Sequence, residues 1–239
     1  MGYKKLMEIY ENQAASIDSE AFNSKMTLQR EWHMEKMRHV LKNVDIKNKI
    51  VLDAGCGSGA FDRQFEKHSK LVIGVDINKY AVSYAMKKSS KKSVYCSGNI
   101  ENIPIIDSSV DAIVCLDALD HCLEPEKVVA EFSRLLKPSG KCVIIVQNHT
   151  RMWRLAEYMW DRLGKGRDYG HVHVSRFDKN SIGSVFKIRG IEVEDMYSIH
   201  HLSPLIVVKR PWNYPEFVEK RLRKRLIGFS IVIVFKKIK

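Results

Sequence analysis

The chain lacks the long apolar segments and paired cysteines that mark membrane-spanning and disulfide-bonded proteins. Its longest apolar run, Ile227 to Phe235, is interrupted by glycine and serine and is too short to cross a bilayer. No apolar run follows Met1, so we expect no signal peptide, and Leu6 stands where an N-myristoylation signal has Ser or Thr. The five cysteines are Cys56, Cys96, Cys115, Cys122 and Cys142. Their irregular spacing favours buried, reduced thiols in a cytoplasmic protein over zinc ligands or disulfides.

Acidic residues are scarce beside the basic ones: 28 Asp and Glu stand against 40 Lys and Arg, a net charge of +12 over 239 residues. The excess is concentrated in residues 209–239, where ten basic residues face only Glu216 and Glu219. Such a region can be a solvated face, bind RNA or touch anionic lipid, and we favour the solvated face. With 45% hydrophobic residues, the chain can form a folded core, and its length fits one domain with a lid or insertion.

Residues 51–59, Val-Leu-Asp-Ala-Gly-Cys-Gly-Ser-Gly, are the most informative segment. An apolar strand runs into Asp53, and three glycines at alternate positions follow it. Glycine lets backbone N–H groups approach a ligand closely, and the helix that follows presents its N-terminus to the same place. We therefore expect a nucleotide-like cofactor. Gly55, Gly57 and Ala60 also satisfy the dinucleotide fingerprint, so a nicotinamide enzyme is one alternative.

The carboxylate of Asp53 separates these two interpretations. A dinucleotide turn places pyrophosphate near this position, and a fixed negative charge would repel it. S-adenosylmethionine has no phosphate and carries a cationic ammonium and a cationic sulfonium. The segment resembles motif I of the class I S-adenosylmethionine-dependent methyltransferases, in particular the type 11 domains of ubiquinone and menaquinone biosynthesis.

The resemblance extends over roughly residues 45–150. An apolar run ends in Asp76, 21 residues after Gly55, the spacing at which an acid meets ribose hydroxyls. Residues 98–104 resemble the family's third-strand exit, with Asn99 in place of the Asp that contacts adenine. Residues 107–116 and 135–141 resemble the fourth strand and the turn before the fifth strand.

The resemblance implies a cofactor site at the carboxyl ends of the first four strands, with S-adenosylmethionine as cofactor, S-adenosylhomocysteine as product and no metal. The implied cofactor-binding residues are Asp53, Ala54, Gly55, Cys56, Gly57, Gly59, Asp76, Ile77, Asn99, Ile100, Leu116, Asp117 and His121.

His121 is our candidate for a catalytic residue. Asp120 and His121 match the last two letters of the family's v-L-E-H pattern after the fourth strand. A structural role, capping the next helix or satisfying the loop, is the alternative. Methyl transfer from a sulfonium depends mainly on positioning, so a base is needed only when the acceptor atom carries a proton. His171 and His173 alternate on an expected lid strand, and no third metal ligand is spaced with them.

Two helices can be predicted from apolar spacing. The first precedes the glycine turn, and its apolar residues are Trp32, Met34, Met37, Val40 and Leu41. The second begins at Pro125, and its apolar residues are Val128, Val129, Phe132, Leu135 and Leu136. For Trp32 and Met37 we expect core packing rather than a role in the acceptor pocket.

Strands that alternate with helices predict an α/β, doubly wound, Rossmann-like fold. The resemblance implies a seven-stranded, mostly parallel sheet with helices on both faces and an antiparallel C-terminal strand. We expect a helical cap at residues 1–44 and a methyltransferase domain at residues 45–239, with lid or insertion segments at about 150–176 and 200–227.

We expect a methyltransferase that acts on a small-molecule or lipid-like acceptor, as a monomer or homodimer. The alternatives are an RNA methyltransferase that uses the basic C-terminal region and a non-catalytic S-adenosylmethionine-binding protein. The basic C-terminal helix would allow peripheral contact with an anionic membrane.

Overall fold

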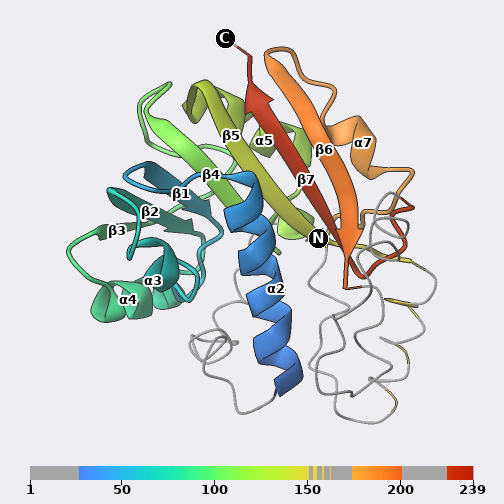
Figure 1. Cartoon of the computed structure of the whole chain (residues 1–239), viewed down its shortest axis with the longest axis horizontal. Coiled ribbons are helices and arrows are strands. Elements are labelled where there is room, and N and C mark those ends of the chain that lie inside the picture. Colours follow the sequence, from blue (N-terminus) through green and yellow to red (C-terminus); the bar gives the residue numbers. More distant parts are fainter. Residues whose placement is uncertain are drawn as a thin grey trace.

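The computed structural model describes residues 27–150, 153, 154, 158, 162, 174–200 and 225–238. A seven-stranded sheet in the order β3-β2-β1-β4-β5-β7-β6 forms the middle layer (Figure 1). The strands are β1 (Ile50–Ala54), β2 (Leu71–Asp76), β3 (Ser93–Ser97), β4 (Val110–Leu116), β5 (Leu136–Gln147), β6 (Ile191–Ile199) and β7 (Ser230–Lys237). Strand β7 runs antiparallel to β5 and β6, and the other strand pairs are parallel. The predicted doubly wound sheet with an antiparallel C-terminal strand is confirmed.

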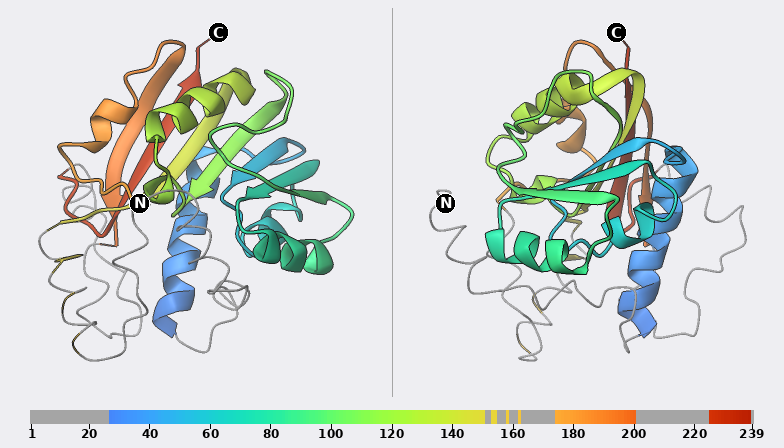
Figure 2. Two further views of the ribbon diagram at one scale, coloured as in Figure 1. Left: turned by 180° about the vertical axis from the view of Figure 1, so that it is seen from behind. Right: turned by 90° about the vertical axis from the view of Figure 1, so that its left-hand side faces the viewer.

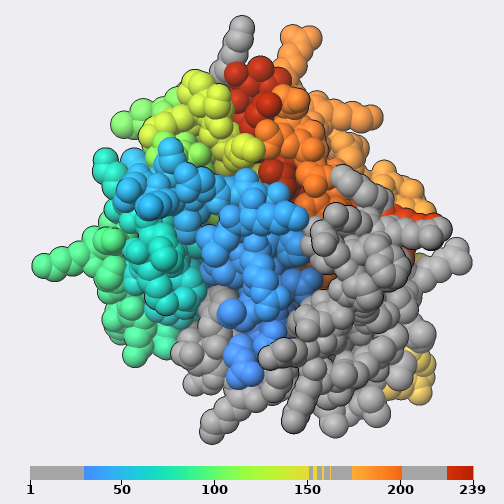
Figure 3. Space-filling model, viewed as in Figure 1, coloured from blue at the N-terminus to red at the C-terminus, as the bar shows by residue number. Residues whose placement is uncertain are grey.

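Helices cover both faces of this sheet. They are α2 (Thr27–Asn43), α3 (Asp62–Phe65), α4 (Lys79–Lys88), the short 3-10 helix η1 (Leu119–His121), α5 (Pro125–Leu135) and α7 (Ile182–Val185). The front and back views place α2 on one face and α5 on the other (Figures 1 and 2). The space-filling view shows α2 lying against the front of the sheet (Figure 3).

The two faces of the sheet carry separate apolar cores. Successive strand side chains point to opposite faces, so Leu52 packs on the face of α5 and Val51 on the face of α2. The core beside α5 includes Ile113, Cys115, Phe132, Ile144 and Phe235. The core beside α2 includes Met37, Val40, Val72, Val114 and Val143. Burial on both faces explains why these strands are continuous apolar runs in the sequence.

Strand β5 departs from the turn expected over residues 135–141. It begins at Leu136, which pairs with Val110, and the pairing with β4 shifts register between Val110 and Ala112. Ser139 lies in this irregularity with a left-handed φ of +64°. The turn is therefore a bulge inside β5 rather than a loop before it, because the backbone keeps pairing on both sides.

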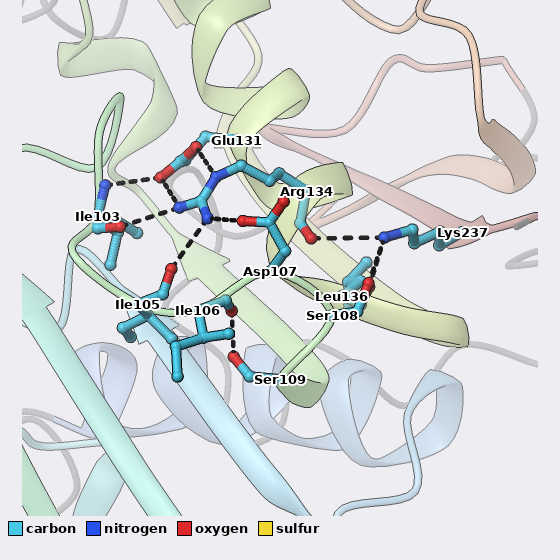
Figure 4. Close-up of polar contacts among 10 residues, drawn as sticks. All are labelled: Ile103, Ile105, Ile106, Asp107, Ser108, Ser109, Glu131, Arg134, Leu136 and Lys237. Atoms are coloured by element: carbon cyan, nitrogen blue, oxygen red, sulfur yellow. Dashed lines mark hydrogen bonds and ion pairs between the residues drawn. The ribbon is translucent and has the colours of Figure 1, made fainter.

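Arg134 on α5 holds the loop that joins β3 to β4 (Figure 4). Its guanidinium donates to the carbonyls of Ile105 and Ile103 at 2.9 and 3.0 Å. It donates to the two oxygens of Glu131 at 2.8 and 2.7 Å and pairs with Asp107. Glu131 also accepts from the backbone N–H of Ile103 at 2.7 Å. These bonds fix the path of the chain after the carboxyl end of β3.

The expected cap and lid segments are described only in part. Helix α2 is the described portion of the cap at residues 1–44. Most of the lid segments at about 150–176 and 200–227 lies outside the described residues. Within the described ranges, no helix has the length and apolar character needed to cross a membrane.

Candidate functional site

The glycine turn lies at the edge of the sheet where β1, β2 and β4 end, called here the carboxyl edge. Gly55, Gly57 and Gly59 have φ values of +85°, +53° and +72°, a region that residues with a side chain rarely adopt. A Cβ at Gly55 would lie 2.2 Å from the Ala118 Cβ. A Cβ at Gly59 would lie 2.9 Å from the Tyr95 hydroxyl. The glycines are thus required by the backbone conformation and by close packing.

The N–H groups of this turn are used inside the protein. Gly55 and Cys56 donate to the Val75 carbonyl at 2.7 and 3.1 Å. Gly57 donates to Asp76 Oδ2 at 2.8 Å. The glycine motif predicts that these groups face a ligand, as they do when a dinucleotide turn binds pyrophosphate. Because the three donors are occupied, the turn fits a cofactor without phosphate better than a diphosphate.

Asp76 ends β2 with a fixed carboxyl orientation. Its Oδ2 accepts from Gly57 N–H and its Oδ1 from Asn78 N–H, each at 2.8 Å. Burial raises the pKa of Asp76, and these two hydrogen bonds and the nearby His121 oppose the rise. A carboxylate oxygen accepts more than one hydrogen bond, so Asp76 keeps acceptor capacity for a ribose diol.

Asp53 differs from the fixed negative charge expected from the sequence. Its side chain is only 3% exposed. Burial and the neighbouring Asp62 carboxyl raise the pKa of Asp53 well above its usual value. The charge of Asp53 therefore depends on a proton and on its neighbours, and the occupied N–H groups, rather than this charge, disfavour a diphosphate.

The remaining predicted cofactor residues divide into polar and core positions. Asn99 follows β3, and its Oδ1 accepts from the Glu101 N–H at 3.0 Å, so an adenine contact would use its second lone pair. Ala54 and Ile100 are buried within the core beside α5, and Leu116 within the core beside α2. Cys56 lies in the glycine turn, and Ile77 directly follows β2.

His121 lies at the end of η1, immediately after β4. Its side chain is 22% exposed, and its Nε2 lies 4.0 Å from Oδ1 of the fully buried Asp120. His121 lies close enough to Asp76 to lower the pKa of that carboxyl. The ends of β2 and β4 therefore contribute to one site. The His121 N–H also donates to the Ala118 carbonyl, so the backbone of this residue has a structural role as well.

Helix α2 contributes Lys36, which the sequence analysis did not predict as a site residue. Asp117, at the exit of β4, has a φ of +52°, and its carboxylate pairs with the Lys36 ammonium. The Lys36 side chain is only 2% exposed. A signal existed, because Lys36 lies four residues after Trp32 and four before Val40, which places it with the buried side chains of the helix.

Further side chains of α2 lie against the end of β6 and the start of β7. His39 Nδ1 lies 2.9 Å from the Tyr197 hydroxyl. Trp32 stacks on His200 with ring centroids 3.7 Å apart, and His200 Nδ1 lies 3.0 Å from Ser230 Oγ. Trp32 is only partly buried and stacks on His200 outside the two apolar cores, whereas Met37 packs in the core beside α2 as expected.

The expected lid histidines, His171 and His173, lie outside the described residues. In the part of the chain that the structure describes, no group of three His, Cys, Asp or Glu side chains could hold a metal ion. Of the five free cysteines, Cys96 is exposed and the other four are buried.

Comparison with known proteins agrees with this geometry. The family described as "Methyltransferase domain" matches residues 52–144. A ubiquinone biosynthesis O-methyltransferase from Coxiella burnetii is 26% identical over 176 residues, which cover 70% of this chain and 73% of the relative. A malonyl-[acyl-carrier protein] O-methyltransferase from Yersinia pestis is 30% identical over 199 residues, which cover 82% and 67%.

Solved structures share the fold at low sequence identity. A methyltransferase from Thermotoga maritima has a TM-score of 0.66 at 16% identity and covers 98% of this chain and 99% of its own. A second, from Aquifex aeolicus, has a TM-score of 0.58 at 18% identity and covers all of both chains. Together with the motif order, these relatives show that the chain belongs to the class I S-adenosylmethionine-dependent methyltransferases, with S-adenosylmethionine as its cofactor.

Proposed function

We propose that the protein methylates an oxygen atom of a small-molecule or lipid-like acceptor by in-line displacement. Both curated relatives described above are named for O-methyl transfer, one in ubiquinone biosynthesis and one on a carrier-linked malonyl group. When bound, S-adenosylmethionine supplies a methyl group on a sulfonium, which is a very good leaving group. The protein's part is then to orient the acceptor and to exclude water.

The observation that carries this proposal is the arrangement of Gly57, Asp76 and His121 at the carboxyl edge. The Gly57 N–H holds the Asp76 carboxylate, which would accept from the ribose hydroxyls of the cofactor. Asp53 would meet the cofactor's ammonium group, and Asn99 would meet the adenine. His121 lies across from Asp76 at the end of β4, where it can take a proton from a hydroxyl acceptor.

Cofactor binding gives the first test. S-adenosylhomocysteine at 100 times its Kd should stabilise the folded protein by about 2.7 kcal/mol and so raise its melting temperature. NAD should not raise it. Asp76→Ala should weaken S-adenosylhomocysteine binding by roughly 10- to 100-fold, because charge-assisted hydrogen bonds are lost. Asp45→Asn, an exposed substitution before β1, is the matched control. Unchanged affinity in Asp76→Ala would contradict the ribose assignment.

Methyl transfer gives the second test. Labelled S-adenosylmethionine incubated with an extract should label a small or lipid-like product, which mass spectrometry then identifies. His121→Gln should lower kcat by about 10²–10⁴-fold and leave the cofactor Kd unchanged, because a base acts only in the transition state. His68→Gln, exposed after α3, is the control. Normal turnover in His121→Gln would leave His121 a structural residue.

RNA is the second acceptor class, and only the basic C-terminal region favours it. Most of its cations lie outside the described residues. Of those described, Lys236 pairs with Glu192, and Lys237 donates to the Leu136 carbonyl at 2.9 Å. Tight RNA binding that falls steeply with salt would move the proposal to this class.

A further inference from the structure

Asp62 fills a space beside Asp53 that a glycine leaves open. Asp53 on β1 pairs in register with Gly74 on β2, and Gly74 pairs with Tyr95 on β3, so the three positions form one row across the sheet. Side chains in such a row point to the same face. A Cβ at Gly74 would lie 2.9 Å from Asp62 Oδ2 and 2.5 Å from the Tyr95 ring. The Asp53 and Asp62 carboxyl groups are therefore neighbours beneath the glycine turn.

Both carboxyl groups are withdrawn from water. The Asp53 side chain is 3% exposed and that of Asp62 is fully buried. The Asp53 carboxyl and the Tyr95 hydroxyl lie close enough to Asp62 to lower its pKa as donors, although neither makes a hydrogen bond of normal geometry to an Asp62 oxygen. Burying two carboxylates with so few donors is costly, so one carboxyl of such a pair tends to keep its proton. The packing of α3 alone therefore gives no reason for an acid at this buried position.

The surroundings of the pair are mostly acidic. The other ionisable groups around it are Cys56 in the turn, Asp76 at the end of β2, Tyr95 on β3, Arg63 on α3 and Glu66 just after α3. His121 acts in turn on Asp76. Arg63 is the cation among these direct neighbours, and its guanidinium donates to the Ser58 carbonyl at 2.8 Å.

These surroundings hold a proton on the pair. Burial raises the pKa of Asp62 to about 6. Burial and the Asp62 carboxyl raise the pKa of Asp53 well above its usual value. Two adjacent buried carboxyl groups do not both ionise without a compensating charge. The pair therefore keeps one proton near neutral pH in the cofactor-free protein.

We propose that cofactor binding releases this proton to solvent. Asp62 is then the positioning residue that makes cofactor affinity depend on pH. The inference rests on the proposed placement of Asp53 at the cofactor's ammonium group. Positive charge brought against the pair offsets the repulsion between the two carboxylates, so the second one can ionise. One O–H bond breaks, and the proton passes to the buffer. Affinity accordingly rises with pH through the range in which the free pair keeps its proton, and it falls as pH falls.

Calorimetry at pH 7.0 in buffers of different ionisation enthalpy counts the protons released when S-adenosylmethionine binds. The unaltered protein should release close to one proton more than Asp62→Asn, because the amide has the same shape but does not ionise. Asp62→Ser is a second variant with the same expectation. Between pH 6 and 7.5 the Kd of the unaltered protein should fall by up to about tenfold per pH unit, and that of both variants by less. S-adenosylhomocysteine, which carries the same ammonium group, should release a similar number of protons.

The outcomes separate this inference from the proposed function. Equal proton release in the unaltered protein and in both Asp62 variants overturns the role of Asp62. Unchanged affinity in Asp53→Asn instead removes Asp53 from the cofactor site, and the proposed placement fails with it. Lost affinity in Asp53→Asn, together with a smaller proton count in Asp62→Asn, supports both. Asp45→Asn should match the unaltered protein in every measurement.

Discussion

Helices α2 and α5 cover opposite faces of one sheet, yet they bury different chemistry. The buried side of α5 is almost entirely apolar, with Val128, Val129, Phe132 and Leu135 fully enclosed. Helix α2 buries Met37 and Val40 as well, but it also buries Glu35, Lys36 and His39. Two of its apolar residues, Met34 and Leu41, are 39% and 47% exposed.

The difference follows from what each helix meets. Helix α5 packs on the middle of the sheet, where both faces are apolar. Helix α2 also meets the strand ends at the carboxyl edge, where Asp117, His200 and Ser230 lie. Polar groups at strand ends need partners, and buried charges of α2 supply them. The helix beside the cofactor edge is thus organised by pairing, and the helix behind the sheet by apolar contact.

The largest effect is expected on α5. Phe132→Ala should lower the free energy of unfolding by about 3–5 kcal/mol, because it opens a cavity in the core beside α5. Urea denaturation measures the loss, and the cofactor Kd of the remaining folded protein should not change. A much smaller loss would mean that this core is loosely packed and would remove the contrast with α2.

The fold and the outline of the site could be predicted because their signals are local. Each strand is a short apolar run, and the 21-residue spacing from Gly55 to Asp76 predicts that this acid lies at the same edge, where it accepts from the Gly57 N–H. Long-range pairing has no such signal. Lys36 and Asp117 are separated by 81 positions, and nothing in the spacing of α2 indicates which distant residue pairs with the buried Lys36.

Asp62 illustrates the same limit within the cofactor edge. In the sequence it is an acid near the start of a helix, where acids are common and favourable. Its burial arises because Gly74 has no side chain and leaves space beside Asp53, which requires the register of β1 and β2. Register is a property of the assembled sheet, so no local pattern could have paired the two acids.

The second largest effect is expected on the stability of the protein at acid pH, and it involves His33 of α2. Burial and then the charge of Lys36 lower the pKa of His33 from 6.5 to about 4, so the folded protein disfavours its protonation. The unfolded chain binds this proton more readily between those values, so stability is lost as pH falls from 6.5 toward 4. The loss is about 3 kcal/mol for a difference of that size.

His33→Gln should remove this part of the acid sensitivity. Unfolding free energies of both proteins measured from pH 7 to pH 4 give the comparison, since the other titrating groups are shared. Curves that stay parallel over this range would show that His33 takes up its proton without cost, and α2 would then resemble α5 in its response to acid.

A third change tests the Lys36–Asp117 pair from each side. Asp117→Asn should cost about 2 kcal/mol, because it leaves the buried Lys36 ammonium with a neutral partner. Asparagine tolerates the left-handed φ at this position, so backbone strain does not confuse the result. Lys36→Met should cost less, because the Asp117 carboxylate is 44% exposed and can turn to water. The reverse order in chemical denaturation would contradict a pair governed by the burial of Lys36.

The smallest effect is expected where α2 breaks the apolar pattern. Leu41 has the spacing of a core residue, yet it is 47% exposed, so Leu41→Gln should change the free energy of unfolding by no more than about 0.5 kcal/mol. The same substitution at the fully buried Leu135 of α5 should cost several times more, because it places an amide in an apolar core. Urea denaturation of the two variants compares them directly. Equal losses would mean that α2 buries its apolar residues as α5 does, and that the polar packing of α2 is not what holds it to the sheet.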